Sequence, residues 1–268
     1  MINHLFFIIH TIYSIFCSVY SFLSTIVERK LFLVSPSSHD FISKGFFEKD
    51  IQSIDTSKLL EIERFNVNPY LFVRNIDQKD LIVLIKSIFN KHFCDYITSI
   101  TGFKYSIDYY IFYDREFINH ADKQVPYLKS WYSYRWHFDK PNSKNMLKII
   151  FPINITNKHG PLTVIDRKTS RSKFSKSFIN NNSNYKFFYG SGNKIYGFLP
   201  NVCLHKDGIP NLGLTATQIM FQLNPYHFWS INSNFSNRDP FLNNKINIWT
   251  NEPKFPYLAY FFDKRIPL

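Results

Sequence analysis

Three histidines in this chain are each followed, two residues later, by an aspartate. The pairs are His120 with Asp122, His137 with Asp139, and His205 with Asp207. On a β-strand, residues two apart project from the same face, so each pair could present an imidazole beside a carboxylate. These groups are two of the three ligands of a facial triad, which binds non-haem Fe(II) and leaves coordination positions open.

The sequence around each pair shows which of the three could belong to a metal site. The first pair lies in DREFINHADKQVP, which lacks alternation and is typical of a loop. The third has only His227 downstream, which is too near in sequence to return after several strands. The middle pair ends WYSYRWHFD, and His205 follows much later, just before the apolar run TATQIMFQL. A metal site therefore needs the middle pair together with His205.

The alternation of residues 131–139 predicts a strand with two unlike faces. Trp131, Ser133, Arg135, His137 and Asp139 share one face, and Tyr132, Tyr134, Trp136 and Phe138 share the other. The wholly aromatic face suits a core. The other reading of the pair is a structural His–Asp hydrogen bond, which the strand alone does not exclude.

The surrounding elements predict a mainly β domain that spans residues 36–268. Residues 36–57 are mixed and predict a loop with a short helix, whereas 80–100 has helical spacing and ends near Gly102. Short β-branched or aromatic runs then follow: YSIDYYIFY, WYSYRWHFD, MLKIIFPINI, PLTVID, NKIYGFL and TATQIMFQLNP. Helices followed by short strands indicate an antiparallel sandwich or barrel with helices outside. NNNSN at 180–184 predicts a surface loop.

Four segments together resemble the phytanoyl-CoA dioxygenase-like family. They are WHFDKPN (136–142), MLKIIFPINI (146–155), GPLTVI (160–165) and CLHKDGIPNLG (203–213), within a similar region covering 131–223. The family consists of Fe(II)- and 2-oxoglutarate-dependent oxygenases with a double-stranded β-helix, or jelly roll. The resemblance implies this fold, and it implies His137, Asp139 and His205 as the iron ligands and catalytic centre.

One departure from the family concerns the co-substrate. The family normally carries an arginine about ten residues beyond the distal histidine, where it pairs with the far carboxylate of 2-oxoglutarate. That register falls here on Thr215 or Ala216. Lys148 could neutralise the carboxylate, with a hydroxyl hydrogen bond from Thr215 or Thr217. Either 2-oxoglutarate binds in this modified way or the site has lost it.

The N-terminal segment is unlike the rest of the chain. Residues 5–27 contain no Asp, Glu, Lys or Arg, and hydroxyl residues recur at helical period: Thr11, Ser14, Ser18, Ser21 and Thr25. We therefore expect residues 1–35 to hold a helix with one hydroxyl face and one apolar face. It would lie in a membrane interface, pack on the domain, or span a bilayer. Each reading leaves the following domain cytoplasmic, and the segment lacks the features of a secretory signal peptide.

Composition narrows the classes of function. With 45% hydrophobic residues the 268-residue chain can bury a large core. Its net charge of +12 is scattered, and the densest cluster, RKTSRSKFSK at 167–176, is either a solvated loop or an anion-binding loop. Cys17, Cys94 and Cys203 lack CxxC spacing and predict reduced thiols.

Three functions remain open on the sequence. The first is a dioxygenase that hydroxylates a small-molecule substrate, anionic or lipid-like. The second is a catalytically inactive jelly-roll binding or scaffold protein of oxygenase descent. The third is a basic surface-binding protein, although the chain has no RNA-binding aromatic motif or helix-turn-helix pattern, so no specific nucleic-acid binding is expected.

Overall fold

The structure, a computed structural model, describes residues 2–68, 70–118, 134–139, 143–172, 185–232 and 265–268. The helices are α1 (Ile2–Phe32), α2 (His39–Lys44), α3 (Ser57–Glu61), α4 (Gln78–Ile88), α5 (Lys91–Thr101) and α7 (Arg167–Ser172), with a 3₁₀ turn η2 (Asn157–His159). The strands are β1 (Phe46–Asp50), β2 (Arg64–Asn68), β3 (Leu71–Arg74), β4 (Lys104–Arg115), β5 (Leu147–Pro152), β6 (Thr163–Ile165), β7 (Tyr185–Phe187), β8 (Lys194–Phe198), β9 (His205–Lys206), β10 (Ala216–Tyr226), β11 (Ser230–Asn232) and β12 (Arg265–Pro267).

Two sheets face each other. The larger has the order β1-β8-β5-β10-β4-β11-β12, with the β2–β3 hairpin joined to β4, and the smaller has the order β7-β6-β9. An antiparallel bridge between His137 and His205 continues the smaller sheet beyond β9. From β4 onward the chain passes repeatedly between the larger and the smaller sheet. This winding is a double-stranded β-helix, so the predicted jelly roll with flanking helices is confirmed.

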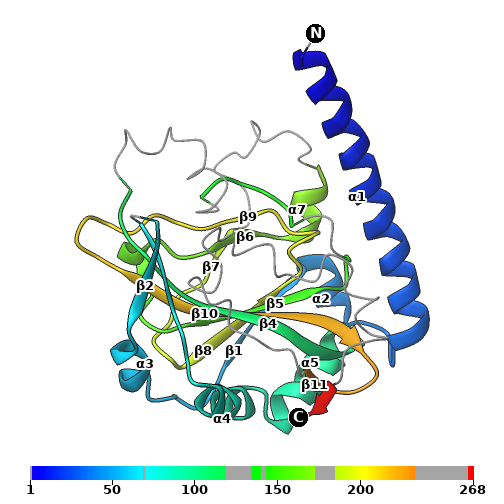
Figure 1. Ribbon diagram of the computed structural model, residues 1–268. Coiled ribbons are helices and arrows are strands. Elements are labelled where there is room, and N and C mark those ends of the chain that lie inside the picture. The colour runs from blue at the N-terminus through cyan, green and yellow to red at the C-terminus, as the bar shows by residue number, and fades with distance from the viewer. Residues whose placement is uncertain (1, 69, 119–133, 140–142, 173–184, 233–264) are drawn as a thin grey trace.

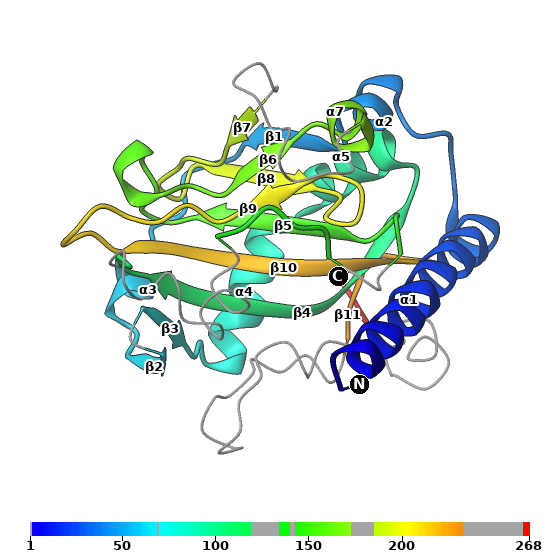
Figure 2. The ribbon, with the colours of Figure 1, turned by 90° about the horizontal axis from the view of Figure 1, so that it is seen from above.

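The larger sheet separates two cores because its side chains alternate between its faces. On β10, Ile219 and Phe221 belong to the cluster that packs against α4 and α5. Met220 points the other way, into the cluster between the sheets with Val164 and Phe198. Figure 1 shows α3, α4 and α5 beneath the larger sheet and β6, β7 and β9 above it, and Figure 2 shows α1 along one end of the sheets.

Most of the predicted strands after residue 103 are present, but one differs. Residues 134–139 form only the single bridge at His137 and no regular strand, and 131–133 lie outside the described residues. The reason is that His137 pairs with β9, which is itself two residues long. The predicted loop at 180–184 also lies outside the described residues.

Several predicted helices and loops need correction. The helix expected over 80–100 is divided into α4 and α5, because Asn90 caps a new helix by accepting a hydrogen bond from the Phe93 amide. Gly102 does end α5, in the left-handed conformation with φ 79°. The basic segment predicted as a loop begins as the short helix α7, and 173–176 lie outside the described residues. Residues 36–57 include a strand, β1, as well as the expected short helix.

Among the described residues no helix combines the length and the hydropathy that crossing a membrane requires. Cys94 and Cys203 are free and buried, and the reduced state of the thiols stays a prediction. Cys17 lies on α1, and its side chain is outside the described part.

Candidate metal centre

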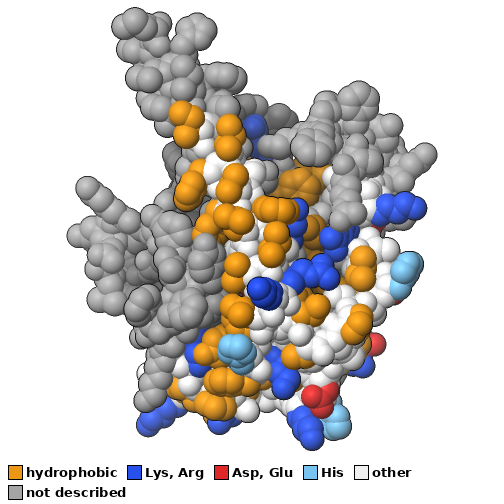
Figure 3. Space-filling model, turned by 90° about the vertical axis from the view of Figure 1, so that its right-hand side faces the viewer, with side chains coloured by type: hydrophobic (Ala, Val, Ile, Leu, Met, Phe, Trp, Pro, Cys, Tyr) orange, Lys and Arg blue, Asp and Glu red, His pale blue; other side chains and the backbone are white. Residues whose placement is uncertain are grey.

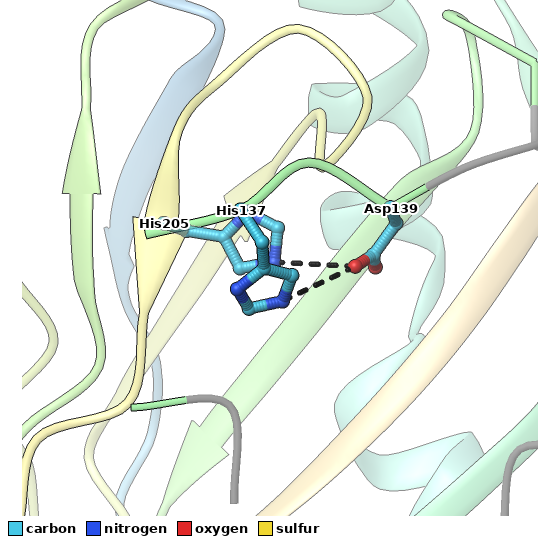
Figure 4. Close-up of side chains that lie close together, drawn as sticks. All are labelled: His137, Asp139 and His205. Carbon is cyan, nitrogen blue, oxygen red and sulfur yellow. Dashed lines mark ion pairs between the residues drawn. The ribbon is translucent and has the colours of Figure 1, made fainter. Parts of the chain in front are cut away.

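The two histidines of the predicted site face each other across a backbone pair. The His137 amide donates to the His205 carbonyl at 3.0 Å, and the His205 amide donates to the His137 carbonyl at 3.2 Å. This exchange places the imidazole rings with centroids 4.2 Å apart. The Asp139 amide donates to the Pro200 carbonyl at 3.1 Å, which holds the carboxylate beside both rings (Figure 4). The structure therefore brings together all three residues named from the sequence.

The hydrogen bonds of the rings direct their outer nitrogens toward Asp139. His137 Nδ1 lies 2.8 Å from the Arg135 carbonyl, and His205 Nδ1 lies 3.0 Å from the Cys203 carbonyl. A carbonyl only accepts, so each Nδ1 carries the proton and each Nε2 keeps its lone pair. The two Nε2 atoms are 3.5 and 3.4 Å from the same oxygen, Asp139 Oδ1.

Three ligand atoms that share a face fit one metal ion. The candidate ligand atoms of His137, Asp139 and His205 all lie within 4.8 Å of one another. A neutral imidazole fixed at Nδ1 by a carbonyl is the usual form of a metal-ligating histidine. A plain His–Asp hydrogen bond would need only one ring, whereas here two lone pairs converge on one carboxylate oxygen. The arrangement therefore suits a divalent cation bound by two imidazoles and one carboxylate.

Lys148 determines the charge of the carboxylate. Its Nζ, on the inner face of β5, forms an ion pair with Asp139 Oδ2. Burial alone would raise the pKa of Asp139, but the charge of Lys148 holds it well below its usual value. The carboxylate is therefore ionised, with Oδ2 toward the lysine and Oδ1 toward the histidines. Whether Lys148 also meets a co-substrate stays a prediction.

The two imidazoles have opposite pKa shifts. Burial acts to lower the pKa of His137, but the hydrogen bond and charge of Asp139 outweigh it and the pKa is raised. Burial and the neighbouring His137 lower the pKa of His205, which is 3% exposed. At neutral pH His205 is therefore a neutral imidazole, and a metal ion would have to compete with a proton mainly at His137.

The two threonines named from the sequence lie away from the triad. Thr217 shares its face of β10 with Ile219 and Phe221, which pack toward the helices, so strand alternation points it away from the space between the sheets. Its amide donates to Asn154 Oδ1 at 2.6 Å, and the Thr215 carbonyl accepts from Asn154 Nδ2 at 3.0 Å. Both hydrogen bonds join backbone atoms of these threonines to the Asn154 side chain, and among the described residues neither threonine has a contact with the triad.

A buried arginine that was not identified from the sequence lies beside the position where the resembled family carries its arginine. Arg115, at the end of β4, is the cross-strand partner of Ala216 and is fully buried. Its Nη1 donates to the Gly208 carbonyl at 2.7 Å and lies 3.3 Å from Asp207 Oδ1. Both contacts are in the turn that follows His205. A guanidinium therefore reaches this region from the neighbouring strand.

Further polar groups line the inner face of the larger sheet. The Tyr113 hydroxyl is hydrogen-bonded to Gln218, and burial, together with the charge of Asp207, raises the Tyr113 pKa. Gln222 lies opposite Lys148 on the adjacent strand and is fully buried. Neither its amide nitrogen nor its oxygen has a hydrogen-bond partner among the described residues. Buried amides are rarely left so, and a polar group of a bound molecule would satisfy this one.

Neither Arg115 nor Gln222 could be identified from local sequence patterns, because the place of each depends on strand register. Arg115 precedes Ala216 by a large separation in the chain, and only the pairing of β4 with β10 brings them together. A systematic search for buried charged residues on predicted strands would have marked Arg115, since a charged side chain on an inner face must have a partner.

Comparisons with known proteins give similarity of structure only. No protein-family model matches the chain. No curated protein matches its sequence. The similar solved structures include HygX from Streptomyces hygroscopicus with nickel, 2-oxoglutarate and hygromycin B bound, at TM-score 0.46 and 10% identity over 71% of this chain and 87% of that chain. The non-haem α-ketoglutarate-dependent epimerase SnoN from nogalamycin biosynthesis has TM-score 0.45 and 10% identity over 69% and 78%. EctD from S. alaskensis with bound Fe has TM-score 0.43 and 14% identity over 71% and 78%.

Proposed function

We propose that this protein is an Fe(II)- and 2-oxoglutarate-dependent oxygenase that hydroxylates a small organic substrate, anionic or lipid-like. The observation that carries the proposal is the convergence of two imidazole Nε2 atoms on Asp139 Oδ1, with both Nδ1 atoms committed to backbone carbonyls. The resemblance of the motifs around these residues to the phytanoyl-CoA dioxygenase-like family supports the same chemistry.

The described residues would hold the metal ion as a facial triad. His137, Asp139 and His205 would supply three ligands on one side and leave the other side open to small molecules. When bound, iron with 2-oxoglutarate and O₂ supplies the oxidation that puts a hydroxyl group on a substrate carbon and releases succinate and CO₂. The protein's own part is to keep Asp139 ionised through Lys148, to keep His205 neutral, and to bury the centre between the two sheets.

Arg115 would bind the far carboxylate of 2-oxoglutarate, which the side chain of Ala216 cannot do. The guanidinium has five N–H donors, so it can donate hydrogen bonds to a second carboxylate beside Asp207, or bind that carboxylate in place of Asp207. The neighbouring Tyr113 and Gln218 add polar groups on the same inner face. In this proposal the 2-oxoglutarate anchor has moved from β10 to β4, its partner in the sheet.

The test is an anaerobic titration of the whole chain, first with Fe(II) and then with 2-oxoglutarate. The titration is monitored by the visible absorption band that a 2-oxo acid has when it is chelated to iron. We expect the band in the unchanged protein and its loss in His137→Ala. Arg115→Gln should keep iron binding but require at least about tenfold more 2-oxoglutarate, since a charge-assisted hydrogen-bond pair is worth over 1.4 kcal/mol.

Arg74→Gln is the matched control. Arg74 is also a buried arginine, and it pairs with Asp114 at 2.8 Å on the opposite face of the sheet. Removing either arginine breaks a buried ion pair, but of the two only Arg115 lies on the inner face of the larger sheet, beside the turn that follows His205. Equal losses of 2-oxoglutarate affinity in the two variants would contradict the role given to Arg115.

The second candidate function is a binding or scaffold protein that has lost catalysis. The observation in its favour is that Arg115 already has a carboxylate partner, Asp207, within the chain. Iron binding without the absorption band would support this candidate, and absence of iron binding would contradict the oxygenase outright.

A further inference from the structure

Helix α1 packs on the domain with its polar side. Glu28 is fully buried, and Ser24 is 1% exposed. Glu28 Oε2 accepts hydrogen bonds from the Ser143 hydroxyl and, at 3.1 Å, from Asn145 Nδ2. The Lys144 amide donates to Thr25 Oγ1 at 2.9 Å. These contacts fix the rotation of the helix about its own axis.

The apolar side of α1 therefore faces outward. Six large apolar side chains form a continuous stripe at helical spacing, with between 40% and 57% of each exposed: Phe16, Val19, Phe22, Leu23, Ile26 and Val27. We call these six residues the apolar stripe. Figure 3 shows hydrophobic side chains along the described part of the helix, with Lys and Arg side chains beside them. Proteins rarely expose a contiguous apolar surface of this kind unless it binds something.

The charges around the apolar stripe indicate what it binds. Glu28 is the only acidic residue of α1, and it points inward. Arg29 and Lys30 are exposed at the end of the helix, and the whole chain carries a net charge of +12. A helix with an apolar face, basic residues and no outward acid is typical of one that lies in the interface of an anionic bilayer.

A second copy of the chain is the other surface that could cover the stripe. Parallel pairing along it would place two copies of Arg29 and of Lys30 next to one another, and this repulsion opposes a parallel dimer. Antiparallel pairing would leave both residues without an acidic partner on the other helix, because the one acidic residue of α1, Glu28, is buried. Anionic lipid headgroups would instead neutralise both residues. We infer that α1 docks the protein on an anionic membrane surface, with the apolar stripe lying in the interface.

The attachment of α1 is joined to the candidate metal centre through one short segment of the chain. The turn at Ser143–Asn145 that binds Glu28 and Thr25 leads directly into β5, where Lys148 contacts Asp139. The inference does not depend on the oxygenase proposal, because the stripe, its charges and its polar attachment are independent of the metal.

The experiment is sedimentation of the full chain with phosphatidylcholine vesicles, with and without phosphatidylserine, in the absence of metal. We expect binding to the vesicles containing phosphatidylserine that weakens as salt rises. The double variant Phe22→Gln, Leu23→Gln should reduce the partition coefficient onto vesicles by roughly tenfold or more. The reason is that two apolar side chains would no longer be buried in the membrane interface. Val83→Gln with Leu212→Gln is the control, because these side chains are 68% and 81% exposed elsewhere and should leave binding unchanged.

The outcomes separate the occupants of the stripe. Circular dichroism should show the same helix content and thermal midpoint in both double variants, since all four residues are exposed. Equal vesicle binding by the stripe variant and the unchanged protein would overturn the inference. So would a dimer in solution that the stripe variant dissociates while neither protein binds vesicles, which would assign the stripe to a second copy.

Discussion

Lys148 is the residue whose charge most directly controls the candidate metal ligand Asp139. Its ammonium is 5% exposed and contacts Asp139 Oδ2, and its charge lowers the pKa of the carboxyl against the effect of burial. Replacing it with methionine leaves a buried carboxylate without this partner. We expect Lys148→Met to lower the free energy of unfolding of the metal-free protein by about 3 kcal/mol.

A divalent cation should reverse this loss. It would take over the role of the ammonium, so added Mn(II), a redox-stable probe, should raise the thermal midpoint more in Lys148→Met than in the unchanged protein. Lys158→Met, at an exposed position, is the control and should change neither quantity. A destabilised Lys148 variant that does not respond to Mn(II) would show that Asp139 is not a metal ligand.

At the scale of single residues, the grouping of His137, Asp139 and His205 could be predicted and the position of Arg115 could not, and the role of the three as metal ligands stays a prediction. His137 and Asp139 are close in sequence, and the motif around His205 completes the set, so local pattern was sufficient. Thr215 and Thr217 were chosen by counting from His205, but one residue of register decides which face of β10 a side chain occupies. Ala216 faces inward there, and its neighbour Arg115 belongs to a strand that no local pattern connects to it.

Among the elements, two turns position His205 by packing glycine against glycine. A Cβ atom added at Gly208 would lie 2.6 Å from the carbonyl carbon of Gly160. The Asn211 amide also donates to the Lys158 carbonyl at 2.9 Å, joining the same turns. Gly208→Ala should therefore push the turn after His205 outward, lowering the free energy of unfolding by about 1–3 kcal/mol and weakening Mn(II) binding.

Gly190→Ala is the control for this substitution. A Cβ there meets Pro152 at 3.4 Å, which is ordinary contact, and Gly190 needs no left-handed conformation. Urea unfolding and the Mn(II)-dependent rise in thermal midpoint measure both variants. If Gly208→Ala keeps full stability and metal affinity, the close approach of the two turns does not position His205.

The elements were predicted best where a regular sequence pattern continues over many residues. β4, β5 and β10 each have clear runs, and the structure contains them. The break at Asn90 was missed because the apolar spacing continues across it, whereas capping depends on a single side chain. β1 was missed because FFEKD owes its strand conformation to pairing with β8, a contact distant in sequence.

For the whole molecule, the sequence predicted the two faces of α1 but left open which one meets the domain. Apolar faces usually do, since burial of apolar surface drives packing. Here buried hydrogen bonds from Ser143 and Asn145 to Glu28 attach the polar face. That arrangement depends on a turn more than a hundred residues away in the chain, so helical periodicity could not reveal it.

The attachment of α1 should make stability depend on pH. Burial raises the pKa of Glu28 from 4.5 to about 7, so the folded state binds this proton more tightly than the unfolded state. The contribution of Glu28 is therefore fully present below pH 4.5 and is lost as pH rises through 7. We expect Glu28→Gln to leave stability nearly unchanged at pH near 4 and to raise it by up to about 3 kcal/mol at pH 8.

Urea unfolding of both proteins across this pH range measures the difference directly. Glutamine keeps an oxygen for Ser143 and Asn145 but has no charge to bury, so the variant should lose the fall in stability between acid and neutral pH. Asp55→Asn is the matched control, because this carboxyl is exposed and accepts a hydrogen bond from the amide of the nearby Ser57. A Glu28→Gln variant with the pH dependence of the unchanged protein would mean that α1 leaves the domain before Glu28 ionises, and the apolar stripe would then lose its fixed orientation.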